Sequence, residues 1–262
     1  MAMSHALNPN DLKAWLVPVA YAAGARIMEV YEKPAEADTK SDGSPVTEAD
    51  AAAEALILPA LAEVAPGITV ISEENAASHA LAAPEAFFLV DPLDGTKEFL
   101  KRDGKGSFTV NIALIDQGVP VFGIVYAPAL DRLFVGIVGQ GASETTGRDT
   151  RNISVRAVPE SGPVAVASAS HRDAATNVWL SENDVKDTVS IGSSLKFCLI
   201  AAGEADVYPR FGPTMEWDTG AGHAVLVAAG GRVTNPDRTD FTFGKADYRN
   251  GPFVAWGQFK GK

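Results

Sequence analysis

Apolar residues recur at helical spacing in two segments near the start of the chain. The first follows Asn8, a natural N-cap with proline after it, and ends before Pro34. The second opens at Thr47, whose hydroxyl can cap a helix, and runs through an Ala-rich stretch to about Val64. The polar residues 35–46 between them predict a loop or loose hairpin. The pattern therefore predicts two N-terminal helices.

Short apolar runs bounded by turn residues predict a cluster of strands after these helices. The runs are 68–71, 87–90, 108–115, 121–126 and 133–138. The polar, glycine-containing residues 141–152 then interrupt the pattern. We therefore place a division near this point, between an N-terminal α+β half at residues 1–145 and a C-terminal half at residues 146–262.

Helices and strands alternate in the C-terminal half. Strands are predicted near 153–155, 164–167, 207–208, 233 and 253–256, and helices at 193–202 and 218–229. Residues 209–212, which begin with proline and end with glycine, are predicted to form a loop. Alternation of this kind is typical of a mixed α/β layer, so the predicted fold class is α/β with an α+β N-terminal half.

Two carboxylates follow one of the predicted strands at its carboxyl end. The apolar run 87–90 leads directly into Asp91 and Asp94, and Pro92 and Gly95 indicate a sharp turn there. Open α/β sheets bind their ligands at such strand ends. Taken alone, the segment fits an Asp-rich turn as well as a metal site, because Asp, Pro and Gly all form turns.

Acidic residues elsewhere in the chain favour the metal site. Glu73 and Glu74 follow an earlier predicted strand, and Asp218 begins a predicted helix. The candidate ligands are the side chains of Glu73, Asp91, Asp94 and Asp218 and the carbonyl of Leu93. This oxygen-only set suits Mg²⁺ or Mn²⁺ and not Zn²⁺. Paired ions roughly 3.5–4 Å apart can hold the attacking and leaving oxygens of an in-line displacement.

Water is the expected nucleophile, because the sequence shows no Ser-His-Asp or Cys-His arrangement. A hydroxyl held by a carboxylate can take the proton of the water, and Thr96 with Asp50 is the candidate pair. Asp50 also fits a plain helix-start charge. Gly95 and Thr96 open a segment whose backbone N–H groups can hold a phosphate. His223 is expected to pack in an apolar helix, whereas His171 fits a substrate contact and a loop equally well.

The charge balance narrows the range of partners. The chain has 22 basic and 33 acidic residues and a net charge of −11, which disfavours general nucleic-acid affinity. Bound cations can still reverse the local field and admit small phosphorylated substrates. No signal peptide is expected, and Lys13, Arg26 and Glu29 exclude a membrane span in the first helix. A single cysteine, Cys198, fits a reducing compartment, so a cytoplasmic protein is expected.

Three motifs and several longer segments carry a family resemblance. The motifs are Glu73-Glu74, Asp91-Pro92-Leu93-Asp94-Gly95-Thr96 and Trp217-Asp218-Thr219-Gly220-Ala221-Gly222. They resemble the lithium-sensitive, magnesium-dependent phosphatase superfamily that includes inositol monophosphatase. Residues 42–47, 95–99, 108–116, 192–198 and 208–214 resemble its bacterial bisphosphate nucleotidases. The match covers nearly the whole chain, except that 75–85 and the tail after Asn235 match poorly.

The resemblance implies a five-layer αβαβα sandwich with the site between two halves. It implies two or three Mg²⁺ ions, with Mn²⁺ as an alternative, held by Glu73, Asp91, Leu93, Asp94 and Asp218. It places Asp50 and Thr96 on the attacking water, and Glu74 is counted with them as a candidate catalytic residue. The residues expected near the substrate are Asp94, Gly95, Thr96, His171, Gly192 and Lys196.

The function implied is that of a phosphomonoesterase acting on a small nucleotide. It would remove the 3′-phosphate of adenosine 3′,5′-bisphosphate to give AMP, with 3′-phosphoadenosine 5′-phosphosulfate as a second candidate substrate. Lys196 and Arg210 favour a second anionic group on the substrate, although a surface salt bridge would explain them equally. The alternatives are an inositol monophosphatase, a fructose bisphosphatase and a metal-binding regulatory module without catalysis. Asp50 and Thr96 argue against the last, since binding alone needs neither, and the oligomeric state stays open.

Overall fold

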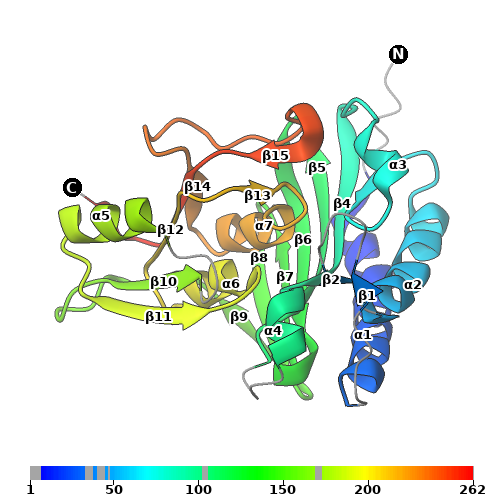
Figure 1. Cartoon of the computed structure of the whole chain (residues 1–262), viewed down its shortest axis with the longest axis horizontal. Helices are drawn as coiled ribbons and strands as arrows, with labels where there is room; N and C mark the ends of the chain where they lie inside the picture. Colours follow the sequence, from blue (N-terminus) through cyan, green and yellow to red (C-terminus); the bar gives the residue numbers. More distant parts are fainter. Residues whose placement is uncertain are drawn as a thin grey trace.

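The molecule is built of five layers that follow one another from right to left in Figure 1. The computed structural model describes residues 7–32, 38–39, 45–46, 48–101, 106–168 and 173–261. The layers are α1 (Pro9–Tyr31) with α2 (Glu48–Val64), a seven-stranded sheet, α6 (Leu195–Ala201) with α7 (Gly220–Ala228), a five-stranded sheet, and α5 (Ala174–Glu182). This order confirms the predicted αβαβα sandwich.

The seven-stranded sheet holds the N-terminal part of the chain together. Its strands, in spatial order, are β3 (Thr69–Ser72), β4 (Ala86–Asp94), β5 (Thr109–Asp116), β6 (Val119–Ala127), β7 (Arg132–Ile137), β8 (Gly141–Thr146) and β9 (Asp149–Ile153). Within this seven-stranded sheet, β3 and β4 pair in parallel, and every other neighbouring pair is antiparallel. Side chains alternate across β5, so Val110, Ile112 and Leu114 pack toward α1 and α2, while Ala113 and Ile115 face the second half. The sheet is therefore buried on both faces over its central strands.

The predicted break at 141–152 is wrong. Residues 141–153 form the β8–β9 hairpin at the edge of the seven-stranded sheet, where Thr145 pairs with Thr150. The polar side chains that suggested a loop belong to an edge strand, in which Arg151 forms an ion pair with the buried Glu144. Ile153 therefore ends the first sheet and does not begin the second. The division of the chain at 145/146 stays a prediction.

The five-stranded sheet belongs to the C-terminal part of the chain. Its order is β11 (Asp187–Ile191), β10 (Val164–Ser168), β12 (Val207–Arg210), β16 (Phe253–Trp256) and β14 (Arg232–Thr234). The predicted loop at 209–212 is partly wrong, because Pro209 and Arg210 continue β12 and pair with Val254 and Phe253. In the first layer, α1 continues without interruption through Pro18 to Tyr31.

Helix α7 lies directly on the seven-stranded sheet because two glycines leave room for it. A Cβ atom at Gly123 of β6 would lie 2.4 Å from the Ala221 carbonyl oxygen, and one at Gly136 of β7 would lie 2.5 Å from the Cα of Val225. Any side chain at these positions would push the helix away from the sheet. The close approach brings the start of α7 to the edge where β3 and β4 end.

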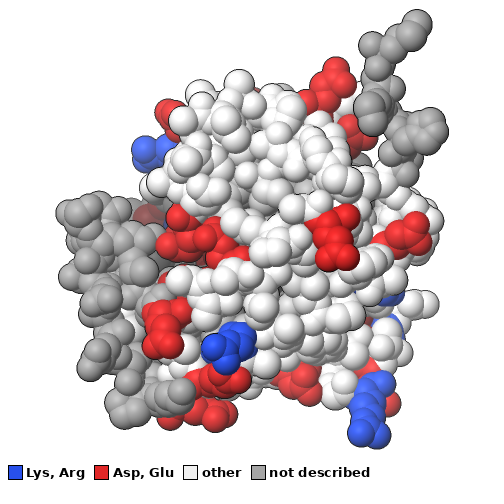
Figure 2. All heavy atoms as spheres, turned by 90° about the vertical axis from the view of Figure 1, so that its right-hand side faces the viewer, with Lys and Arg blue, Asp and Glu red and all other residues white. Residues whose placement is uncertain are grey.

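The outer helical face, on the side where α1 and α2 lie, is mostly uncharged, and the charges visible on it are mainly acidic (Figure 2). Trp15 of α1 and Leu56 of α2 are 50% and 38% exposed. No described helix combines the length and apolarity that a bilayer span requires.

Candidate active site

Three carboxylates from distant parts of the sequence converge at one edge of the seven-stranded sheet. Glu73 follows β3, Asp91 lies within β4, and Asp218 precedes α7. One oxygen of each lies within 4.8 Å of the others. Because β3 and β4 are parallel, their carboxyl ends meet at the same edge. Asp218 reaches them from the other half of the molecule.

The end of β4 is a bulged strand and not the sharp turn that Pro92 and Gly95 predicted. The strand continues to Asp94, with a register shift between Asp91 and Asp94. The Leu93 backbone N–H donates to Asp91 Oδ1 at 3.1 Å and holds that carboxylate. Gly95 has φ of +94°, a conformation that favours glycine, and leads into α4 (Thr96–Lys101). A bulge of this kind re-aims side chains at a strand end.

Ser194 connects the two halves at the site. Its backbone N–H donates to Asp94 Oδ2 at 2.5 Å, and its hydroxyl donates to the backbone carbonyl of Asp218, also at 2.5 Å. Asn111 of β5 donates to the same Asp94 oxygen at 3.4 Å. Sequence reasoning missed both residues, although each lies in a segment that carried the family resemblance.

A buried polar network fixes the segment that carries Asp218. Glu216 is fully buried and accepts from the backbone N–H of Gly244 at 2.8 Å and from the Lys245 ammonium at 3.1 Å. Asn250 donates to the Met215 carbonyl at 2.8 Å, and the Met215 N–H donates to Asp218 Oδ2 at 2.8 Å. The only sequence signal for this network was an acid directly before the Trp217-Asp218 motif.

The carboxylates repel one another strongly while no cation lies between them. At 4.8 Å, two unit charges at an effective dielectric constant of about 20 repel by about 3–4 kcal/mol. Burial, together with the charges of Glu74, Asp50 and Asp94, raises the pKa of Glu73 to about 7. Burial first, and neighbouring carboxylates second, raise the pKa of both Asp91 and Asp218. Protons or cations must neutralise part of this cluster.

The residues fit a hard divalent cation. The converging atoms are all carboxylate oxygens, and neither Cys nor His belongs to the group. Backbone N–H groups each hold one oxygen of Asp91, Asp94 and Asp218 in place. Carboxylates held in this way are suited to Mg²⁺ or Mn²⁺. The cluster can therefore hold a metal ion.

The predicted catalytic residues lie around this cluster. Asp50 is 3% exposed in the first turn of α2, and its charge contributes to the raised pKa of Glu73 and Asp91. The charge of Glu74 also raises the pKa of Glu73. The Thr96 hydroxyl donates to the Leu93 carbonyl at 3.4 Å. The catalytic roles of Asp50, Glu74 and Thr96 stay predictions.

Three of the predicted substrate residues, Gly192, Lys196 and Arg210, form hydrogen bonds to neighbouring groups of the protein. The Gly192 N–H donates to Ser107 Oγ at 3.2 Å, and a Cβ there would lie 2.7 Å from Glu98 Cγ. The buried Lys196 ammonium donates to the Ser193 carbonyl at 2.5 Å, and burial lowers its pKa to about 8. Arg210, which is 8% exposed, donates to the carbonyls of Gly212 and Pro213, both at 3.1 Å.

Of the two histidines discussed from the sequence, the structure describes His223 but not His171. His171 lies outside the described residues, as do Thr47 and most of 35–46. His223 packs against Phe241 and Phe243, and burial lowers its pKa to about 3. The expectation that His223 is a packing residue is therefore confirmed.

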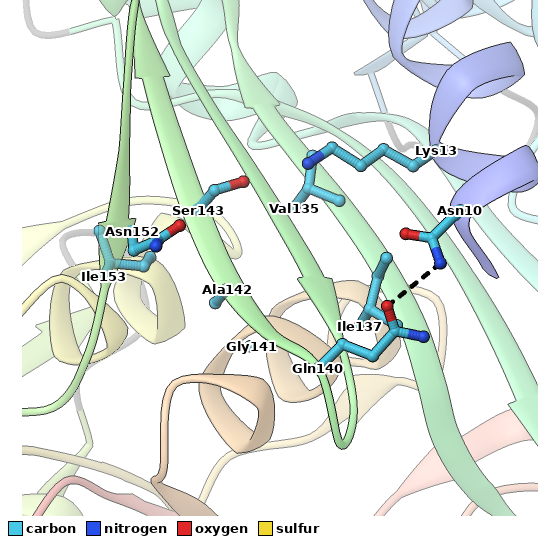
Figure 3. A pocket seen from close by; sticks show the side chains of 10 residues that line it. All are labelled: Asn10, Lys13, Val135, Ile137, Gln140, Gly141, Ala142, Ser143, Asn152 and Ile153. Atoms are coloured by element: carbon cyan, nitrogen blue, oxygen red, sulfur yellow. Dashed lines mark hydrogen bonds between the residues drawn. The ribbon is translucent and has the colours of Figure 1, made fainter.

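The structure also has a hollow that lies away from the carboxylates. A groove of about 280 Å³ opens between α1 and the strands β7, β8 and β9 (Figure 3). Lys13 extends over it, and Asn10 donates to the side-chain carbonyl of Gln140 at 3.1 Å. None of its lining residues is acidic. The groove therefore offers no carboxylate for a cation.

Repulsion among the carboxylates predicts that the free energy of unfolding of the metal-free chain depends on pH. The pKa of Glu73 rises from 4.5 to about 7 on folding, so the folded state binds a proton that the unfolded state releases between these values. The free energy of unfolding is therefore expected to fall as the pH rises from about 4.5 to about 7. Each pKa unit corresponds to about 1.4 kcal/mol. Denaturant unfolding with a chelator present measures this slope.

Two controls belong to this measurement. Glu73→Gln is expected to flatten the slope, because the amide does not titrate in this range. Saturating Mg²⁺ is expected to restore stability above neutral pH, since a bound cation replaces the proton. A metal-free chain that gains stability over the same range would contradict the electrostatic account.

Comparisons with known proteins agree with this geometry. Residues 8–259 match the model of the inositol monophosphatase family. The 3′(2′),5′-bisphosphate nucleotidase CysQ of Salmonella typhimurium is 49% identical over 218 residues, which is 82% of this chain and 87% of the relative. The CysQ structure from Bacteroides thetaiotaomicron has a TM-score of 0.82 at 36% identity and covers 94% of this chain and 97% of that one. An inositol monophosphatase structure from Anabaena has a TM-score of 0.71 at 28% identity and covers 94% and 91%.

Proposed function

The chain belongs to the inositol monophosphatase family, and we propose that it is a 3′(2′),5′-bisphosphate nucleotidase. It removes the 3′-phosphate of adenosine 3′,5′-bisphosphate by hydrolysis and leaves AMP. The sulfated nucleotide 3′-phosphoadenosine 5′-phosphosulfate is a second substrate under the same proposal. The observation that carries the proposal is the convergence of Glu73, Asp91 and Asp218 in a chain so similar to CysQ nucleotidases.

Enzymes of this family depend on metal ions, and we assign Mg²⁺ to this chain with Mn²⁺ as an alternative. The residues that would hold two or three ions are Glu73, Asp91, Asp94 and Asp218, with the carbonyl of Leu93. Bound ions supply charge neutralisation for the phosphate and lower the pKa of a coordinated water. The tight carboxylate spacing supports the assignment, because it is costly without a counter-charge.

Apart from binding the ions, the residues of the protein are proposed to transfer one proton and to hold the phosphate. The Thr96 oxygen accepts a proton from the attacking water while its own proton passes to Asp50, since a hydroxyl hydrogen can rotate toward either partner. The departing 3′-oxygen takes up a proton from solvent water and becomes the 3′-hydroxyl of AMP. Glu74 increases the negative potential that the Glu73 carboxylate experiences. Gly95 and Thr96, at the start of α4, are proposed to hold the transferred phosphate through their backbone N–H groups.

The second phosphate distinguishes this substrate from a monophosphate. Lys196 and Arg210 are the proposed cations for it, and both now donate to backbone carbonyls. Binding a phosphate would exchange these partners for charged oxygens, which form stronger hydrogen bonds. His171 and Gly192 are proposed to contact the rest of the nucleotide.

Removing either cation is expected to affect the bisphosphate more than a monophosphate. Loss of a charge-assisted hydrogen bond costs about 1.5–3 kcal/mol, or roughly 10- to 150-fold. Lys196→Ala and Arg210→Ala should therefore raise KM for adenosine 3′,5′-bisphosphate by about that factor relative to KM for inositol 1-phosphate. Arg210→Lys is the matched control for charge without the planar fork. An equal effect on both substrates would mean that these side chains support only the backbone they contact.

Product identification tests the proposed function. The chain is incubated with adenosine 3′,5′-bisphosphate and Mg²⁺, and the nucleotide product is separated by chromatography. The proposal predicts 5′-AMP and inorganic phosphate in equal amounts. Formation of 3′-AMP would show that the 5′-phosphate had been removed instead of the 3′-phosphate. Either that result or the absence of any product would contradict the proposal. The cytoplasmic location stays a prediction.

A further inference from the structure

A histidine that lies outside the family motifs touches the neighbours of two proposed metal ligands. His79 ends the short helix α3 (Ala76–His79), and its Nε2–H donates to the Ser72 carbonyl at 2.8 Å. Its ring stacks on Trp217 with centroids 4.6 Å apart and planes 21° apart. Ser72 directly precedes Glu73, and Trp217 directly precedes Asp218. One side chain therefore contacts both segments that deliver these carboxylates.

Both contact points of His79 are themselves fixed. Ser72 is fully buried, its N–H donates to Ser78 Oγ at 3.1 Å, and its hydroxyl donates to Glu54. Trp217 is 4% exposed and belongs to the core between the two sheets. Each group is held firmly within its own segment, so the ring packed between them links the two segments directly and resists a change in their separation.

We propose that His79 is a positioning residue that holds the Glu73 and Asp218 segments at the separation needed for metal binding. This inference rests on the proposed metal-dependent function. The two carboxylates come from different halves of the molecule and repel each other, so the cation-free site tends to open. The hydrogen bond and the stacked ring resist that opening. The cation then meets a preorganised pair of ligands and loses less binding energy to closing the site.

The proposal differs from a plain packing role in what it predicts for metal affinity. Residues that orient metal ligands typically change affinity by about 10- to 100-fold when they are removed. His79→Ala is expected to weaken Mg²⁺ binding by about that factor. His79→Phe keeps a ring against Trp217 but cannot donate to Ser72, so its affinity should fall between those of the alanine variant and the unaltered chain.

Tyr248→Phe is the matched control from the same region. The Tyr248 hydroxyl donates to the carbonyl of Leu81 at 2.9 Å, so it also ties the segment after β3 to the C-terminal half. It contacts neither Ser72 nor Trp217 through that bond. The control is therefore expected to lower the melting temperature without changing Mg²⁺ affinity.

Isothermal titration calorimetry of Mg²⁺ into the metal-free chains tests the inference, with circular dichroism confirming that each variant is folded. The expected result is weaker binding by the two His79 variants and unchanged binding by Tyr248→Phe. Equal affinity in all four chains would overturn the positioning role but leave the proposed function standing. An unaltered chain that binds no Mg²⁺ would overturn both. If the alanine variant does not fold, weaker binding by His79→Phe supports the positioning role, and unchanged affinity in that variant overturns it.

Discussion

The Asp91→Asn variant is expected to lose nearly all phosphatase activity and to regain little of it at high Mg²⁺. Asp91 is 1% exposed, and its carboxylate interacts electrostatically with four other acids: Glu73, Asp94, Asp218 and Asp50. The amide keeps the shape of the side chain but removes the anionic oxygen at the centre of the cluster. Breaking a buried charge pair costs about 3–5 kcal/mol, or roughly 150- to 5,000-fold in kcat/KM.

The same substitution should stabilise the metal-free protein. Removing one of several mutually repelling buried charges lowers the energy of the folded state, so the free energy of unfolding in a chelator should rise. Asp116→Asn is the matched control, because Asp116 is exposed and pairs with Ala86 at the opposite end of the β4–β5 ladder. Near-normal turnover in Asp91→Asn would remove this residue from the centre of the mechanism.

The Thr96→Val variant is expected to bind metal normally and to turn over slowly. Valine matches the shape of threonine but lacks the hydroxyl that now donates to the Leu93 carbonyl. If this hydroxyl moves the proton of the attacking water, kcat should fall by about 10²- to 10⁴-fold, the usual contribution of general acid–base catalysis. Steady-state kinetics at saturating Mg²⁺ measure the fall, and calorimetry measures metal affinity.

Thr96→Ser separates the hydroxyl from the methyl group. The serine variant keeps the hydroxyl and is expected to retain most of kcat. An unchanged kcat in Thr96→Val would show that the hydroxyl serves only the start of α4. Loss of metal binding in that variant would indicate that the contact with Leu93 shapes the ligand set instead.

The helices and strands whose own residues carry a clear pattern of apolar positions were predicted correctly. The strand before Asp91, the helix after Asp218 and the helix from Glu48 each combine an apolar period with a terminal signal in the same few residues. The candidate metal ligands stood out for the same reason, since each acid follows a predicted strand or begins a predicted helix. Convergence of Glu73, Asp91 and Asp218 depends on the parallel pairing of β3 with β4 and on the approach of α7.

The features that sequence reasoning missed depend on contacts between distant residues. The β8–β9 hairpin looked like a loop because an exposed edge carries polar side chains, and its stability comes from pairing with β7. Ser194 contacts Asp94 across 100 positions of sequence, and Glu216 contacts Lys245 across 29. His79 lies in a stretch that matched the family poorly. No local period marks such residues, because their partners are set by the packing of the two halves.

The nucleotidase assignment is tested by comparing kcat/KM for adenosine 3′,5′-bisphosphate with kcat/KM for inositol 1-phosphate, measured with the same enzyme at the same Mg²⁺ concentration. A chelator-treated sample provides the baseline for metal dependence. We expect a clear preference for the bisphosphate. The activity itself should disappear with the chelator and return with Mg²⁺. A higher kcat/KM for inositol 1-phosphate would contradict the nucleotidase assignment, and activity that survives the chelator would contradict the role of the carboxylate cluster.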